Sequence, residues 1–415
     1  MKIMVETITS SQEAIQLEDK YGAHNYHPLP VVLSRGEGVF LWDVEGRRYF
    51  DFLSAYSAVN QGHCHPRLVQ ALVDQAKELT LTSRAFYNDK LGLAEKYVCE
   101  TFGYQKALFM NSGAEANETA IKLARKWGYR KKGIAPNEAV IVAVKQNFHG
   151  RTTTVISAST DEDARRDFGP FMPGFEIVPY NDVSALEKAL ANPKVCGLWI
   201  EPIQGEAGVF VPDEGYLRAA ERICKHNNVL LMMDEIQTGI ARTGKMLASD
   251  HEGVRPDLLI LGKALSGGLL PVSCVLADDA IMLLIKPGEH GSTFGGNPLA
   301  AVVCMEALAV VKDEDLAGNA AKLGNIFRAR MLGLKEKTSL ITLVRGKGLL
   351  NAIVVNDSPD SDTAWRLCME FMQNGLLAKP THGNIIRLAP PLVITEEQIH
   401  ECCDIIEKCV TNFKK

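Results

Sequence analysis

Residues 229–268 read VLLMMDEIQTGIARTGKMLASDHEGVRPDLLILGKALSGG, and this stretch decides the fold. It contains two short apolar runs, Val229–Met233 and Leu258–Leu261, and a charged side chain follows each run almost at once. Neither run alternates apolar with polar residues, which indicates strands buried on both faces. Strands of this kind occur in parallel sheets that carry helices on both sides, so the stretch predicts an α/β fold.

The same pattern continues outward along the chain. Further continuous apolar runs are found at Ala107–Met110, Val140–Val144, Leu198–Ile200 and Val272–Ala277. Amphipathic or helix-forming segments are found at Glu115–Lys131, Tyr216–Asn227, Pro298–Lys312 and Leu316–Leu334. Because such strands and helices alternate, we predict an open, mostly parallel, doubly wound sheet.

Three regions are predicted along the chain. They are an N-terminal arm with a hairpin, a large α/β domain and a smaller C-terminal α/β domain, at residues 1–56, 57–316 and 317–415. The hairpin is predicted from strand-like residues Val39–Trp42 and Arg48–Phe52 around a turn at Asp43–Gly46. The C-terminal domain is expected to end in a βαβ-like tail, in which Thr395 and Gln398 form a capping box that opens the last helix.

Composition excludes several classes of function. The 415 residues are 46% hydrophobic and 23% charged, which is typical of a globular protein. The formal charge of −5, from 45 basic and 50 acidic residues, argues against the basic surface that nucleic acids or anionic membranes require. No apolar run is long enough to span a bilayer.

The cysteines and the N-terminal residues favour a cytoplasmic protein. The ten cysteines are spread thinly and form no C-x-x-C pair, so we interpret them as reduced and mostly buried thiols. His63-Cys64-His65 is interpreted as a turn rather than a metal site, since adjacent residues seldom bind one ion without a third ligand elsewhere. Residues 1–20 are polar and acidic, without the features of a targeting leader; a mature organellar form remains an alternative.

Three strand ends carry the chemistry. In an open parallel sheet, ligands bind at the carboxyl ends of the strands. One predicted strand is followed directly by Asp234, a second is followed by Lys263, and a third leads into Ser112-Gly113-Ala114, which opens a helix. Each feature alone is common in loops and helix caps. Together they match pyridoxal 5′-phosphate, which needs a lysine for its aldehyde, a carboxylate for its ring nitrogen and backbone N–H groups for its phosphate.

One motif suggests a nucleotide-binding protein instead. Residues 239–246 have the G-x-x-x-x-G-K spacing of a nucleotide-binding loop, but Met246 follows where a Mg²⁺-binding hydroxyl belongs. We therefore do not expect an ATPase.

Six segments, in order, resemble the class III (ω-amino acid) aminotransferases, which are fold type I pyridoxal-phosphate enzymes, and within them most closely those that act on ornithine. The segments are NSGAEAN at 111–117, NFHGR at 147–151, EPIQGE at 201–206, DEIQ at 234–237, LGKALSGG at 261–268 and GSTFGGN at 291–297. The resemblance implies a fold type I transferase and this cofactor, and it assigns roles to single residues.

The implied cofactor residues follow from these segments. Lys263 resembles the Schiff-base lysine and proton-transfer base, with a low pKa maintained by neighbouring positive charge. Asp234 resembles the partner of the ring nitrogen. Phe148 resembles the aromatic residue that stacks on one face of the cofactor ring, and Ile236 would pack on the other face. Gln237 resembles the hydrogen-bond partner of the 3′ oxygen of the cofactor. The cofactor phosphate would be bound by Ser112, Gly113 and Ala114 and, from the neighbouring subunit, by Ser292 and Thr293.

The implied substrate residues distinguish the members of the class. Arg151 and Arg387 are expected to bind carboxylates, since a guanidinium can bind a carboxylate through two hydrogen bonds. Glu206 resembles a glutamate that pairs with Arg387 and masks its charge while an ammonium end reacts. Tyr26 and Tyr56 resemble residues of the ornithine-specific arm, where Tyr26 and Arg151 bind the α-amino acid end.

The resemblance thus implies a homodimer, with higher assemblies left open, that moves the δ-amino group of ornithine to 2-oxoglutarate. The products are glutamate and glutamate 5-semialdehyde, which cyclises to a pyrroline carboxylate. Alternatives are a class III enzyme acting on acetylornithine or 4-aminobutyrate, a decarboxylase or aminomutase on the same fold, and a non-catalytic protein. One departure is His149, where some ornithine enzymes carry a bulky aromatic residue.

Overall fold

The computed structural model describes residues 8–414. Its centre is a seven-stranded sheet in the order β4-β10-β9-β8-β7-β5-β6. The strands are β4 (Lys106–Met110), β5 (Val140–Val144), β6 (Phe175–Val178), β7 (Val195–Ile200), β8 (Leu230–Asp234), β9 (Leu258–Leu261) and β10 (Ser273–Ala277). All neighbours are parallel except β10, which runs antiparallel to both β4 and β9. The predicted doubly wound, mostly parallel sheet is confirmed.

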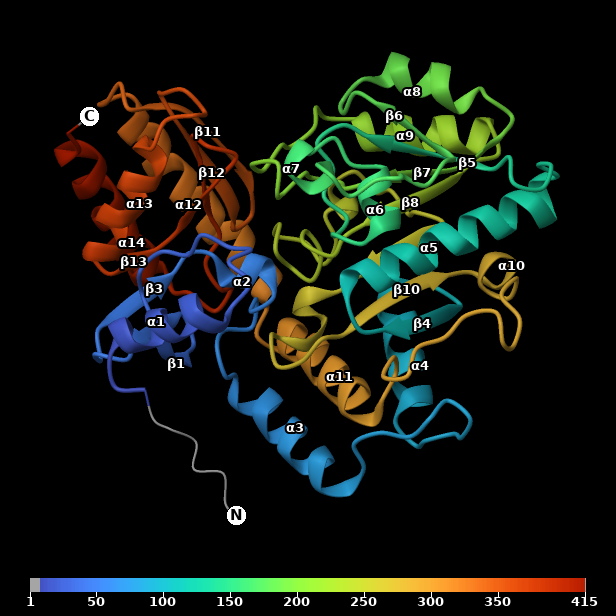
Figure 1. Ribbon diagram of the computed structural model, residues 1–415, viewed down its shortest axis with the longest axis horizontal. Helices are drawn as coiled ribbons and strands as arrows, with labels where there is room; N and C mark the ends of the chain where they lie inside the picture. Colours follow the sequence, from blue (N-terminus) through green and yellow to red (C-terminus); the bar gives the residue numbers. More distant parts are fainter. Residues whose placement is uncertain (1–7, 415) are drawn as a thin grey trace.

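Along β8, the two faces of this sheet belong to two separate cores. Leu230 and Met232 pack into the core beneath α5 (Gly113–Trp127). Leu231 and Met233 point to the opposite core, which α8 (Val183–Leu190) and α9 (Tyr216–His226) cover. Figure 1 shows α8 and α9 on one side of the strands and α5 on the other. Burial on both faces explains the continuous apolar runs.

Two details of this region differ from the sequence prediction. β6 was not predicted; it is an edge strand whose residues are mostly half-buried, and Glu176 interrupts its apolar run. The helix predicted at Glu115–Lys131 begins at Gly113 and is α-helical to Trp127, and a π-helical turn, η1 (Gly128–Lys132), continues it.

The C-terminal tail is not a βαβ unit, so that prediction was wrong. Strands β11 (Ile341–Lys347), β12 (Leu350–Val355), β14 (Lys379–Thr381) and β15 (Ile385–Leu388) form an antiparallel sheet in the order β11-β12-β15-β14. The strand after α13 (Thr363–Gln373) is β13 (Leu376–Leu377), and it pairs in parallel with β3 (Arg48–Asp51) of the N-terminal region instead. Because that partner is distant in sequence, local pattern gave no sign of it.

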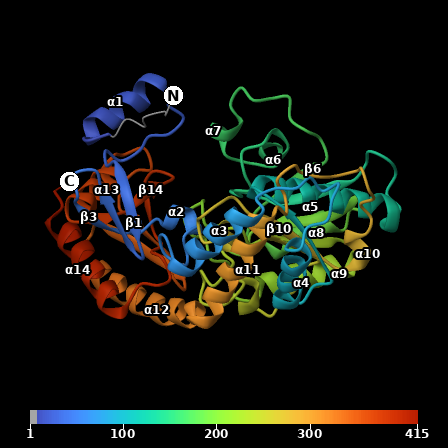
Figure 2. The ribbon, with the colours of Figure 1, turned by 90° about the horizontal axis from the view of Figure 1, so that it is seen from below.

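The N-terminal hairpin is confirmed as β2 (Phe40–Asp43) and β3, with β1 (Leu33–Glu37) beside β2. Helix α1 (Ser11–Tyr21), which was not predicted, precedes them and is held by hydrogen bonds from Ser11 to the Glu45 carboxylate. In Figure 2 this helix lies at the outer side of the N-terminal strands.

The remaining helices complete the layers. They are α2 (Ser54–Ser57), α3 (Pro66–Glu78), α4 (Leu91–Phe102), α6 (Thr153–Ser157), α7 (Glu162–Arg165), α10 (Asp279–Met282), α11 (Pro298–Asp313), α12 (Leu316–Lys335) and α14 (Glu396–Asn412), with 3-10 turns η2 (Ser249–His251) and η3 (Lys263–Ser266). The predicted capping box of Thr395 and Gln398 opens α14. Among the described residues, no helix combines the length and apolar character needed to cross a bilayer.

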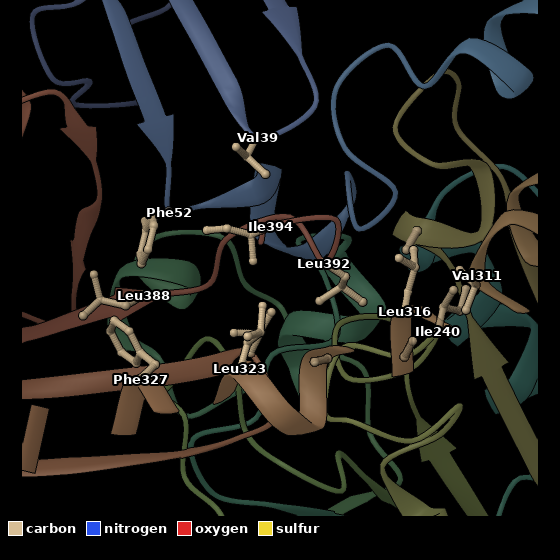
Figure 3. Close-up of a cluster of buried hydrophobic side chains, with 14 of the residues drawn as sticks. Val39, Phe52, Ile240, Val311, Leu316, Leu323, Phe327, Leu388, Leu392 and Ile394 are labelled. Atoms are coloured by element: carbon tan, nitrogen blue, oxygen red, sulfur yellow. The ribbon is translucent and has the colours of Figure 1, made fainter. Parts of the chain in front are cut away.

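A single core joins the N-terminal strands, the large sheet region and the C-terminal helices. Figure 3 shows Val39 and Phe52 facing Leu323 and Phe327 of α12, with Leu388 and Ile394 between them. Because side chains from the start, middle and end of the chain are buried together, this core holds the N- and C-terminal regions against the edge of the sheet that carries the site.

Candidate active site

The carboxyl ends of β4, β8 and β9 lie around one cavity of about 180 Å³. Most of the residues assigned to the cofactor line it, together with three that were not assigned a role, namely His149, Gly150 and Glu201. The lining residues are Gly113, Ala114, Phe148, His149, Gly150, Glu201, Asp234, Ile236, Gln237 and Lys263. The structure therefore brings together side chains from segments that are far apart in the sequence.

Asp234 is buried at the end of β8 and is held by three donors. Its Oδ2 accepts hydrogen bonds from Asn117 Nδ2 at 2.9 Å and from His149 Nδ1 at 2.7 Å. Its Oδ1 accepts the backbone N–H of Ile236 at 3.0 Å. A carboxylate can accept about four hydrogen bonds, so Asp234 retains one acceptor position for a further donor.

Lys263 begins η3 directly after β9. Its backbone is left-handed, with φ of 47°, a strained conformation for a residue with a side chain. Burial lowers the pKa of the Lys263 amine; Glu206 and Asp234 oppose this shift, and Arg387 adds to it. Neighbouring positive charge was predicted to keep this pKa low, but desolvation is the larger cause. A lower pKa gives a larger fraction of neutral amine, the form that attacks an aldehyde or accepts a proton.

The start of α5 offers free backbone donors. Ser112 Oγ accepts the N–H of Glu115, and the Ser112 carbonyl accepts that of Ala116. The Glu115 carboxylate in turn accepts the N–H of Ser112, which completes a capping box. The N–H groups of Gly113 and Ala114 take no part in this cap and remain for an anion at the helix N-terminus.

The walls of the cavity leave little room for larger residues. A Cβ atom on Gly113 would lie 2.9 Å from Cδ1 of Ile236. Phe148 lies at another side, where its backbone N–H donates to Glu201 Oε2 at 2.9 Å. Burial, followed by the charge of Asp234, raises the pKa of Glu201 well above its usual value.

These residues fit pyridoxal 5′-phosphate on structural grounds. An amine, a carboxylate with one acceptor position left and two free N–H groups border one narrow cavity with Phe148 and Ile236 in its walls. Such a set matches an aldehyde, a protonated ring nitrogen and a phosphate on a flat ring.

Ser292 and Thr293 lie outside this cavity. Ser292 Oγ accepts a hydrogen bond from Asn111 Nδ2 at 2.8 Å, and Thr293 is exposed. Neither residue contributes to the lining of the cavity within the described chain.

A wider mouth adjoins the cofactor cavity. Two overlapping cavities of about 510 and 660 Å³ share Tyr26, Tyr56, Phe148, Arg151 and Glu206. Lys263 lines one and Arg387 lines the other. All five residues assigned to substrate therefore lie at the entrance to the cofactor cavity.

Glu206 and Arg387 form the predicted pair. Arg387 Nη1 donates to Glu206 Oε2 at 2.9 Å, and Arg387 is only 2% exposed. Burial opposes ionisation of Glu206, but the charge and hydrogen bond of Arg387 outweigh it, so the pKa of Glu206 is lowered. Arg387 also donates to Gln237 Oε1 at 3.3 Å, while its Nε is buried without a hydrogen-bond partner among the described residues.

Tyr56 lies in a short segment whose backbone is left-handed. The four residues of α2, Ser54–Ser57, have φ values of 50°, 45°, 60° and 72°. Left-handed residues with side chains cost about 1–2 kcal/mol each. Asp51 Oδ1 holds the turn by accepting the N–H groups of Leu53 and Ser54, and the guanidinium of Arg387 lies 4.7 Å from the centre of the Tyr56 ring.

The other end of the mouth is open to solvent. Tyr26 is 73% exposed, and the Arg151 side chain is 59% exposed. Arg151 lies 3.5 Å from Asp161 Oδ2, and Asp163 lines the same two cavities.

The G-x-x-x-x-G-K segment forms turns, and no helix follows it directly. Within it, Arg242 is fully buried and donates to Asn60 and to the carbonyls of Leu349 and Pro390. Burial lowers the pKa of Arg242 to about 9. The segment is thus a structural connection between the large sheet region and the C-terminal sheet.

Sequence reasoning missed several residues of the site. Asn117 and Trp199 support Asp234 from α5 and β7, and Lys379 with His382 line the mouth. Asn117 stands in the quoted NSGAEAN segment, so its place was visible although its contact was not.

Comparison with known proteins identifies the family of the chain. The family model described as "Aminotransferase class-III" matches residues 21–410. The mitochondrial ornithine aminotransferase of Rattus norvegicus is 59% identical over 97% of this chain and 91% of its own length. Among solved structures, the ornithine aminotransferase of Toxoplasma gondii, reported with pyridoxal phosphate at its active site, is 48% identical over 98% of this chain and 95% of its own, with a TM-score of 0.96. An acetylornithine aminotransferase from Elizabethkingia anophelis is 60% identical over 98% of this chain and 100% of its own, with a TM-score of 0.91.

Proposed function

The chain belongs to the class III aminotransferase family, and from that premise we propose that it transfers the δ-amino group of L-ornithine to 2-oxoglutarate. The products are glutamate and glutamate 5-semialdehyde, which cyclises to a pyrroline carboxylate. The observation that carries the proposal is the pair of buried Arg387 and half-buried Glu206, 2.9 Å apart, at the entrance to the cavity that holds Lys263.

The cofactor is pyridoxal 5′-phosphate, which when bound supplies an electron-withdrawing ring that stabilises the charge left on a deprotonated carbon. Lys263 is the amine for its aldehyde, and its Nζ moves the proton at the substrate carbon that carries the reacting amine. Asp234 would accept the ring N–H with its remaining acceptor position, and the N–H groups of Gly113 and Ala114 would bind the phosphate.

The Glu206–Arg387 pair decides which end of ornithine reacts. An unpaired guanidinium would repel the δ-ammonium, since two like charges about 4 Å apart repel by about 4 kcal/mol at an effective dielectric of 20. It would also attract the α-carboxylate to the wrong end. With Glu206 in place the charge of Arg387 is neutralised, so the δ-end can approach Lys263.

The second substrate, 2-oxoglutarate, carries two carboxylates. Arg151 binds one of them, and Arg387 becomes the site for the other once Glu206 moves away. Arg387 has donor capacity for this, because its Nε is buried without a hydrogen-bond partner in the described chain. One pocket can therefore serve both substrates in turn, as a ping-pong cycle requires.

The exposed end of the mouth favours ornithine over its acetylated form. Tyr26 and Arg151 receive the α-carboxylate end, and Asp161 and Asp163 place negative charge along the same cavity. A free α-ammonium is attracted by that charge, whereas an acetylated nitrogen carries no charge to attract. 4-Aminobutyrate has no second amino group to use this end at all.

A homodimer with shared active sites completes the proposal. Phe86, Tyr87 and Phe294 are 72%, 104% and 55% exposed, which is unusual for large apolar residues. Phe294 is adjacent to Thr293, and both belong to the segment from which Ser292 and Thr293 would reach the phosphate of the partner subunit. Light scattering on the purified protein should give twice the mass of the chain or a multiple of that value.

We also propose a reducing, cytoplasmic setting, with an organellar matrix as the alternative. Of the ten cysteines, all without a disulfide, eight are buried and only Cys64 is exposed. Fractionation of the source cells with antibody detection would separate the two locations.

The function is tested by comparing initial rates for ornithine, N-acetylornithine and 4-aminobutyrate, each with 2-oxoglutarate. We expect kcat/KM for ornithine to exceed the other two by at least about tenfold, equivalent to roughly 1.4 kcal/mol. A higher value for either rival would refute the choice of substrate and leave the family unchanged. Release of CO₂, or turnover without a keto acid, would indicate a decarboxylase or an aminomutase.

A further inference from the structure

We propose that His149 is a positioning residue that fixes the Asp234 carboxylate for the ring nitrogen of the cofactor, an inference that rests on the proposed function. The imidazole lies 2.7 Å from Asp234, with Nδ1 facing Oδ2, and its side chain is fully buried. A carboxylate oxygen only accepts hydrogen bonds, so Nδ1 must be the donor.

The ring of His149 is itself held in place. It stacks on Trp199 with 3.8 Å between ring centres and 16° between planes. Its other nitrogen, Nε2, is buried without a partner in the described chain. Within the described chain, the hydrogen bond to Asp234 is therefore the only hydrogen bond of the imidazole ring.

Asn117 holds the same carboxylate oxygen from another direction. Its Nδ2 donates to Asp234 Oδ2 and to the His149 carbonyl, both at 2.9 Å. Trp199 Nε1 donates to Asn117 Oδ1 at 3.0 Å, which fixes which side of the amide faces Asp234. Trp199 thereby contacts both donors of Oδ2, one through its N–H and one through its ring face.

The two oxygens of the Asp234 carboxylate have different hydrogen-bond donors. Oδ2 receives both side-chain donors, while Oδ1 receives only the backbone N–H of Ile236. Both strong side-chain contacts lie at Oδ2, so the open acceptor position is at Oδ1. Without His149, Asn117 alone would hold Oδ2, and rotation of the carboxylate about its Cβ–Cγ bond would become easier. His149 thus holds the orientation of the Asp234 carboxylate, although it does not itself touch the reacting atoms.

The test uses three variants and two cofactors, with no amino donor present. His149→Phe keeps a flat ring on Trp199 but removes the donor. His149→Asn restores an amide nitrogen near the place of Nδ1. The control, Phe175→Leu, disturbs packing against Trp199, whose ring lies 6.4 Å away, without removing any hydrogen bond.

Apoprotein is titrated by absorbance with pyridoxal 5′-phosphate and with its 1-deaza analogue, in which a C–H replaces the ring nitrogen. We expect His149→Phe to weaken binding of pyridoxal phosphate by about tenfold, because a hydrogen bond to a charged group is lost. Binding of the deaza analogue should change by less than about twofold, since it offers Asp234 no N–H. His149→Asn should recover most of the loss, and Phe175→Leu should not distinguish the two cofactors.

Equal weakening for both cofactors would show that His149 only packs, and would overturn the inference. So would unchanged binding in His149→Phe, or no recovery in His149→Asn. Because ornithine is absent from this assay, a wrong substrate would leave its result intact. A wild-type protein that binds neither cofactor would refute the proposed function itself.

Discussion

The cofactor cavity and the substrate mouth adjoin each other but are built differently. In the cavity, Asp234 is 4% exposed and is held by donors from three elements of the chain. At the mouth, Tyr26 is 73% exposed, and the nearest charged partner of Arg151 lies at 3.5 Å. Buried polar groups are usually hydrogen-bonded within the protein because leaving them unpaired is costly, whereas exposed groups can hydrogen-bond to water until a ligand binds. The cavity is therefore preformed, whereas Tyr26 and Arg151 at the mouth are exposed and accessible to a ligand.

The largest effect should come from the cavity. Lys263→Ala removes the only amine that lines it among residues 8–414, so turnover should fall by at least about 10³-fold. The absorbance of a cofactor bonded to the lysine should also disappear. The measurement is a visible spectrum combined with steady-state rates, with Lys245→Ala as the control because Lys245 is exposed and lies outside the cavity. A Lys263→Ala protein that stayed yellow and active would contradict the cavity's role.

A smaller effect is expected where the two regions meet. Glu206→Ala exposes the charge of Arg387, so donors that present an α-carboxylate at this point should improve. We expect the ratio of kcat/KM for glutamate to that for ornithine to rise by about tenfold, or about 1.4 kcal/mol. Glu187→Gln, an exposed change on α8, is the control. If the ratio stays the same in Glu206→Ala, the ion pair does not select the reacting end.

The open mouth should respond in KM rather than in kcat. Arg151→Lys keeps the positive charge but loses the two-pronged contact with a carboxylate. We expect KM for ornithine to rise by about fivefold, equivalent to about 1 kcal/mol, with kcat changed by less than twofold. Arg166→Lys, an exposed change in the same loop region, should leave both constants unaltered. A fall in kcat with an unchanged KM would place Arg151 in the chemical step instead.

The smallest effect concerns pH. Glu206 has a lowered pKa, so its ion pair is fully formed above the ordinary value of 4.5 and is lost only as pH falls through the lower folded-state value. The glutamate-to-ornithine ratio should therefore be constant from about pH 6 to pH 9, where Glu206 stays ionised. Rate profiles with both donors in one buffer series would check this. A change of more than about threefold across that interval would mean that another group controls donor choice.

The same contrast explains what could be predicted from sequence. The central strands were predicted because burial on both faces leaves continuous apolar runs, as in β8 and β9. Edge strand β6 and the pairing of β13 with β3 were missed, since one is half-buried and the other depends on a distant partner.

At the site, residues in strand-end motifs such as Asp234 and Lys263 could be identified from the sequence. Their supports were not. Trp199 lies within an apolar strand, and the hydrogen bond from its Nε1 to Asn117 Oδ1 could not be predicted from the sequence. The left-handed turn at Tyr56 was also missed, because Ser-Ala-Tyr-Ser contains no glycine, the residue that usually indicates such a backbone.

The most direct measurement follows one nitrogen atom. Ornithine labelled with ¹⁵N only at the δ position is incubated with the holoenzyme and unlabelled 2-oxoglutarate, and the glutamate formed is analysed by mass spectrometry. If Glu206 masks Arg387 so that the δ-end meets Lys263, essentially all new glutamate carries the label. Unlabelled glutamate in this experiment, with the label retained in the keto acid formed from ornithine, would show that the α-amino group reacts and would contradict the account.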